Sequence, residues 1–84
     1  MKHAGEAALD ALEPLLERMR TLEGLRERKR GAFYRGSSAF LHFHEDPAGF
    51  FADIKLGADF VRMRVNNRKE IDALIRAAKK ALAV

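Results

Sequence analysis

Two histidines and an aspartate are the side chains of this chain whose types and spacing suggest chemistry. His42 and His44 are two positions apart, a spacing that places both imidazoles on one face of a β-strand. Two imidazoles beside a carboxylate such as that of Asp53 form a donor set for a transition metal ion. An imidazole held by a carboxylate can also act as a general base. Whether these groups meet depends on how the surrounding strands pair.

The length and composition are those of one small folded domain. The chain has 84 residues, of which 48% are hydrophobic and 33% charged, so we expect a single domain over residues 1–84. There is no cysteine, which excludes disulfides and thiolate metal sites. No apolar run approaches the roughly 18 residues of a membrane span, and the first residues lack a signal-peptide pattern. We therefore expect a cytoplasmic protein with no membrane partner.

Alternating side chains predict an antiparallel sheet. Segments 39–45, 50–56 and 59–65 each read as a strand, and a short fourth strand is expected over 32–35. Segment 25–31 shows no clear pattern. The sheet is therefore expected to have three to four strands.

Two turns predict how these strands pair. Gly57 suits the first position of a two-residue type II′ turn, and residues 46–49 read as a four-residue loop containing Pro47. Apolar side chains then gather on one face of the sheet, as expected for a core. The opposite face is predicted to carry three cross-strand rows: His42–Asp53–Arg62, His44–Phe51–Arg64 and Phe40–Lys55–Phe60.

One helix is expected before these strands in the sequence and another after them. Apolar residues recur at helical spacing over 6–23, with a kink or a new start near Pro14 and a stop at Gly24. Asn67 followed by Glu70 resembles a capping box that opens a second helix. The predicted fold is a two-layer α+β domain: an N-terminal helix, the sheet and a C-terminal helix, with both helices on the apolar face. One helix on each face is the alternative.

Three phenylalanines on an uncovered sheet face indicate a contact surface. We therefore expect a non-enzymatic interaction module that forms a homodimer or a higher homo-oligomer through this face, without a cofactor. Catalysis is the weaker hypothesis, because no nucleophile has a convincing context. His3, close to the start of the chain, is not expected to contribute.

Two further functions remain open for the same face. Its aromatic and cationic side chains suit single-stranded nucleic acid, and a nearby basic run could contact phosphates. That run comprises Arg26, Arg28, Lys29 and Arg30, although a net charge of +4 is modest. A metal ion held by His42, His44 and Asp53 is the other alternative, which a neighbouring Arg62 would oppose.

Several short segments resemble a family of small uncharacterised bacterial proteins. Its pattern, Gly-x-Phe-Tyr…Phe-Leu-His-Phe-His-Glu-Asp…Ala-Asp, is matched by Gly31 to Tyr34, by Phe40 to Asp46 and by Ala52-Asp53. The resemblance covers roughly residues 24–82 and implies no established activity, cofactor or partner. It draws attention to these positions: His42, His44, Glu45, Asp46 and Asp53.

Overall fold

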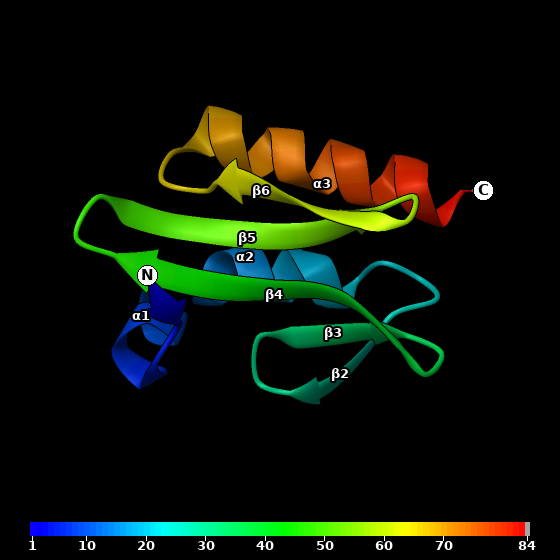
Figure 1. Cartoon of the computed structure of the whole chain (residues 1–84), viewed down its shortest axis with the longest axis horizontal. Coiled ribbons are helices and arrows are strands. Elements are labelled where there is room, and N and C mark those ends of the chain that lie inside the picture. The colour runs from blue at the N-terminus through cyan, green and yellow to red at the C-terminus, as the bar shows by residue number, and fades with distance from the viewer. Residues whose placement is uncertain (84) are drawn as a thin grey trace.

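An antiparallel sheet with its helices on one face forms the molecule, seen in a computed structural model that describes residues 1–83 (Figure 1). Strands β2 to β6 are adjacent in sequence order, and β1 pairs with β4 beside β3. The predicted two-layer α+β class is confirmed. In chain order the elements are β1 (Lys2–His3), α1 (Glu6–Ala11), α2 (Glu13–Arg20), β2 (Arg26–Lys29), β3 (Ala32–Arg35), β4 (Ser38–Asp46), β5 (Gly49–Leu56), β6 (Asp59–Arg64) and α3 (Arg68–Leu82).

Within the described residues the sheet has six strands, more than the three to four predicted. The additional strands, β1 and β2, carry no hydrophobic alternation. Strand β2 is almost wholly exposed, and Glu27 anchors it by accepting the Gly31 N–H at 2.9 Å and by pairing with Arg20. Strand β1 has only two residues. Backbone pairing and ion pairs, rather than burial, form these strands, so alternation could not predict them.

The predicted N-terminal helix is broken into two. Leu12 ends α1 and also precedes α2, and Pro14 lies in the first turn of α2. A proline there loses no hydrogen bond, since the first N–H groups of a helix have no partner within it. The new start near Pro14 is thus confirmed. Helix α2 ends at Arg20, before Gly24, which adopts a φ of 91° in the following turn.

The predicted strand pairing is confirmed for β4, β5 and β6. His42 lies opposite Asp53, and Asp53 lies opposite Arg62. The next row along the strands contains His44, Phe51 and Arg64, also as predicted. Gly57 has a φ of 69° in the hairpin that closes with Leu56 opposite Asp59. The two turns therefore set the face on which each side chain lies.

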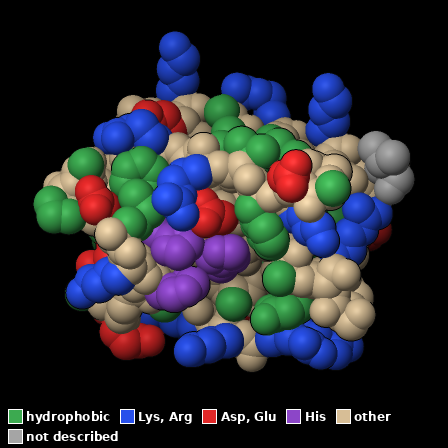
Figure 2. Space-filling model, in the orientation of Figure 1, with side chains coloured by type: hydrophobic (Ala, Val, Ile, Leu, Met, Phe, Trp, Pro, Cys, Tyr) green, Lys and Arg blue, Asp and Glu red, His purple; other side chains and the backbone are tan. Residues whose placement is uncertain are grey.

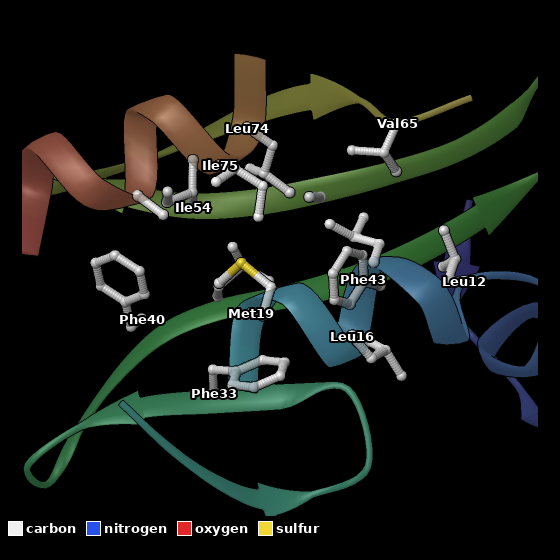
Figure 3. Close-up of a cluster of buried hydrophobic side chains, with 14 of the residues drawn as sticks. Leu12, Leu16, Met19, Phe33, Phe40, Phe43, Ile54, Val65, Leu74 and Ile75 are labelled. Atoms are coloured by element: carbon white, nitrogen blue, oxygen red, sulfur yellow. The ribbon is translucent and has the colours of Figure 1, made fainter. Parts of the chain in front are cut away.

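Phe40 was placed on the wrong face. It is only 4% exposed and belongs to the hydrophobic core under the helices (Figure 3). The cause is a bulge: Phe33 pairs with Leu41 and Tyr34 with Ala39, which leaves Phe40 without a partner on β3. An extra residue of this kind interrupts the alternation of a strand. Phe40 and Leu41 are consequently both buried, and the third predicted row keeps only Lys55 and Phe60.

The core lies between the helices and one face of the sheet (Figure 3). Leu16 and Met19 of α2 and Leu74 of α3 are each 0% exposed, and Arg18 of α2 bonds Asp72 of α3 at 2.8 Å. Both helices therefore cover the same face, as predicted, and the arrangement with one helix on each face is wrong. No helix within residues 1–83 has the length and apolar character needed to cross a bilayer.

The start of α3 is tied to the sheet. The Asn67 side chain accepts the Glu70 N–H at 2.9 Å, which confirms the predicted cap. The Glu70 carboxylate accepts the N–H of Asn66, at 2.8 Å, rather than that of Asn67 as in a regular capping box. Asn66 in turn accepts the Phe50 N–H at 2.6 Å. These bonds hold α3 against β5, on the side opposite to the histidines.

Candidate functional site

All three histidines of the chain gather on the face of the sheet that the helices leave uncovered. Figure 2 shows them in contact with one another, with basic and acidic side chains at their border. His42 and His44 come from β4, and His3 comes from the short strand β1. Asp53 on β5 lies opposite His42, and Arg62 on β6 lies opposite Asp53. We call these five residues the histidine cluster.

Asp53 is the centre of the histidine cluster. It is 8% exposed, although no helix covers it, because polar side chains surround it. Arg62 donates from Nε to Oδ1 and from Nη2 to Oδ2, each at 2.8 Å. These bonds lower the pKa of Asp53, more than enough to offset the effect of burial. The carboxylate is therefore ionised at neutral pH.

His44 has buried nitrogens that no hydrogen bond satisfies. Its Nε2 lies 3.1 Å from Asp53 Oδ2. This contact does not have the geometry of a hydrogen bond, and neither Nδ1 nor Nε2 has a hydrogen-bond partner within residues 1–83. A buried polar atom left in this state costs about 1–3 kcal/mol. A role in binding a metal ion is one explanation for a buried imidazole without hydrogen bonds.

His42 points at the same carboxylate oxygen. Its Nε2 is 3.5 Å from Asp53 Oδ2, and its ring meets that of His44 edge-on at 5.0 Å between centroids. Burial lowers the pKa of His42, and this effect exceeds the opposing attraction of Asp53. The imidazole is therefore neutral at neutral pH, the state in which it can ligate a metal.

His3 is the member of the histidine cluster that sequence reasoning missed. Its ring stacks on that of His44 with 4.6 Å between centroids and lies 5.7 Å from that of His42. Strand β1 reaches this position by pairing Lys2 with Glu45 and His3 with His44. Nothing in the local pattern of a two-residue strand indicates a pairing with residues about forty positions away.

Glu45 and Asp46, which the family resemblance brought forward, have structural partners. Glu45 accepts the Gly5 N–H at 2.7 Å and so holds the segment after β1. Asp46 accepts the Ala48 N–H at 3.1 Å within the turn between β4 and β5. Both carboxylates therefore shape the backbone around the histidine cluster.

The other residues predicted on this face lie around the histidine cluster. The Arg64 guanidinium lies 5.3 Å from the Phe51 ring centroid, and Phe51 is half-buried. Phe60 is 44% exposed, and its ring lies 5.3 Å from that of His42. Lys55, opposite Phe60, borders a surface hollow near the end of α3. The predicted face is present, except that Phe40 lies in the core instead and His3 also lies on this face.

The basic run is only partly available for phosphates. Arg30 binds carboxylates of α1 and α2, with contacts of 2.7 Å to Asp10 and 2.8 Å to Glu13. Arg28 lies over the Tyr34 ring, 4.7 Å from its centroid. Arg30 therefore fastens the β2–β3 hairpin to the helices. Arg26 and Lys29 are exposed, and within residues 1–83 neither side chain has a hydrogen-bond or ion-pair partner.

The histidine cluster offers donors for a metal ion. One nitrogen each from His42 and His44 and one oxygen of Asp53 all lie within 4.8 Å of one another. Bonds of about 2.0–2.2 Å to a shared ion bring donors somewhat closer than that. The donors would therefore have to move closer together, by side-chain rotation, to bind one ion.

Comparison with known proteins gave no match among family models, curated proteins or solved structures. The family resemblance seen in the sequence therefore stays a prediction.

Proposed function

We propose that this protein binds a divalent transition metal ion through His42, His44 and Asp53. One observation carries the proposal: two imidazole Nε2 atoms converge on Asp53 Oδ2, at 3.5 and 3.1 Å, while the nitrogens of His44 have no hydrogen-bond partner among the described residues. An imidazole whose only task was to bond Asp53 would direct its N–H at the oxygen. An ion between the three donors would give the Nε2 atoms of both histidines a partner.

The donor set favours the zinc, nickel and copper class. Imidazole nitrogen suits these ions, whereas magnesium and calcium prefer oxygen ligands. The ionised Asp53 carboxylate supplies negative charge, and His42 is neutral at neutral pH. No deprotonation of the carboxylate or of His42 is therefore needed before an ion can bind.

Arg62 is the competitor of the ion. Its guanidinium occupies both oxygens of Asp53 and carries a positive charge. The Arg62 side chain is 49% exposed, so it can turn into solvent when an ion arrives. Metal affinity is expected to be lowered by this competition but not abolished.

Calorimetric titration of zinc, nickel and copper salts into the chelator-treated protein tests the proposal. The wild type should bind one ion per chain, and His42→Ala should weaken binding at least about tenfold through loss of a ligand. Lys55→Ala is the matched control, since it lies on the same face but outside the histidine cluster. Absence of binding for all three ions in a folded wild type would overturn the proposal.

Self-association through the same face is a second proposed function, favoured by the exposure of Phe60. Phe60 is 44% exposed and its ring lies 5.3 Å from that of His42, so an exposed aromatic side chain borders the histidine cluster. Together with the half-buried Phe51 it offers apolar surface that a second copy of the chain could cover. Light scattering should find a dimer for the wild type and a monomer for Phe60→Glu. A monomeric wild type would exclude this function.

A further inference from the structure

We infer that His3 is a fourth ligand of the same ion, supplied by strand β1, and that metal binding fastens β1 to the sheet. The inference rests on the proposed function, because it requires the ion held by His42, His44 and Asp53. It goes further in naming a residue from a distant part of the chain and a structural consequence of metal binding.

The pairing of β1 with β4 brings His3 beside this site, although the ligand atoms that lie within 4.8 Å of one another are those of His42, His44 and Asp53. His3 lies directly opposite His44, and antiparallel partners project to the same face of a sheet. Its ring centroid is 4.6 Å from that of His44 and 5.7 Å from that of His42. The three imidazoles therefore surround one region of the open face, bordered on its other side by Asp53.

The backbone of β1 is held while its imidazole remains exposed. Ala4 donates its N–H to the Phe43 carbonyl oxygen at 3.0 Å, and Gly5 donates to Glu45 at 2.7 Å. His3 itself is exposed, so its ring can leave the stack on His44 without unpacking the core. A rotation of this side chain turns one ring nitrogen toward the ion.

A fourth ligand determines which ion is preferred. Three imidazoles and one carboxylate complete the tetrahedral set that zinc adopts in closed protein sites. Manganese and magnesium prefer six oxygen-rich positions and gain little from three imidazoles. Zinc is therefore the expected ion, and cobalt(II), which accepts the same geometry, reports it through its visible absorption.

Metal binding should also stabilise β1 itself. A two-residue strand at a sheet edge contributes few contacts and opens easily. An ion bound to both His3 and the β4 histidines requires β1 to be paired with β4, so it binds the paired state more tightly than the state with β1 detached. This difference in affinity shifts the population toward the paired state. The amides of Ala4 and Gly5 are the reporters, since both donate hydrogen bonds only when β1 is in place.

The test compares wild type, His3→Ala and the control Lys2→Ala, all without an added affinity tag. His3→Ala should bind zinc at least about tenfold more weakly and should lose the intense visible bands of tetrahedral cobalt(II). Zinc should slow hydrogen exchange at residues 3–5 in wild type and Lys2→Ala, but not in His3→Ala.

The two proposals fail in different ways. Equal zinc affinity and an unchanged cobalt(II) spectrum in His3→Ala would overturn the role of His3 and leave the three-ligand site standing. A wild type that binds neither ion would overturn the site and the role of His3 together. Weaker zinc binding in His3→Ala, together with hydrogen exchange at residues 3–5 of the wild type that zinc does not slow, would overturn the fastening of β1.

Discussion

Asp53 and Ile54 are neighbours on β5, and each is almost wholly buried, yet their surroundings are opposite. Ile54 is 0% exposed among the apolar side chains beneath the helices, whereas Asp53 is 8% exposed among imidazoles and a guanidinium. Burial of Ile54 removes apolar surface from water and stabilises the fold. Burial of Asp53 costs desolvation, which its partners must offset. Similar burial thus stabilises the fold on one face and forms the proposed metal site on the other.

Replacement of the buried aliphatic residue should have the largest effect. Ile54→Ala leaves a cavity in the core and should lower the free energy of unfolding by about 2–5 kcal/mol. Urea denaturation followed by circular dichroism measures this loss. The control Val61→Ala, at the neighbouring position on β6 where the side chain is 41% exposed, should cost far less. Equal losses for the two variants would mean that burial beneath the helices does not determine the loss of stability.

Removing the charge of Asp53, the neighbour of Ile54, should weaken metal binding more than it destabilises the fold. Asp53→Asn keeps the shape of the side chain but removes the charge that draws a cation, so zinc affinity should fall at least about tenfold. Its effect on unfolding should be smaller than that of Ile54→Ala, because Arg62 can turn its guanidinium into water. Calorimetry and urea denaturation on the same sample separate the two. Unfolding of Asp53→Asn at low urea would show that the carboxylate holds the fold.

Removal of the competing guanidinium should strengthen metal binding. Arg62→Gln frees both Asp53 oxygens and deletes a nearby positive charge, so zinc affinity should rise by roughly threefold to tenfold, less than the loss in Asp53→Asn. Arg64→Gln, on the same strand but outside the histidine cluster, is the matched control. Weaker zinc binding in Arg62→Gln would instead assign Arg62 to holding Asp53 in position.

The smallest effect is expected in β2, where an ion pair replaces apolar burial. Hydrogen bonding to Arg20 lowers the pKa of Glu27 from its usual 4.5. The ionised form therefore stabilises the folded state above that pH, and this contribution is lost as the pH falls through the lower folded value. Urea midpoints between about pH 5 and pH 3 should decline less steeply for Glu27→Gln than for wild type. Equally steep declines of the urea midpoint in wild type and Glu27→Gln would contradict the lowered pKa of Glu27.

The open face was largely predictable, because short-range rules determine it. The Gly57 turn and the sorting of apolar residues place Asp53 opposite Arg62, and the loop at Pro47 places His42 opposite Asp53. Both rules act within a few residues of a turn. The same local reasoning located Pro14 in the first turn of a helix.

Long-range contacts explain what could not be predicted. Phe40 turns into the core through a bulge that arises only when β3 pairs with β4. His3 reaches the histidine cluster through a strand pairing whose partners are far apart in the chain. Arg30 has the sequence context of a free cation, but the fold surrounds it with Glu6, Asp10 and Glu13. Each case depends on a partner that local patterns do not identify.

The position of β1 has a practical consequence for purification. An affinity tag joined before Met1 would emerge next to His3, and a run of added histidines would compete for the same ion. The end of α3 lies at the opposite end of the molecule (Figure 1), so a tag joined there would keep clear of the open face. Metal content measured on protein with such a tag before Met1 would include the metal that the tag itself binds.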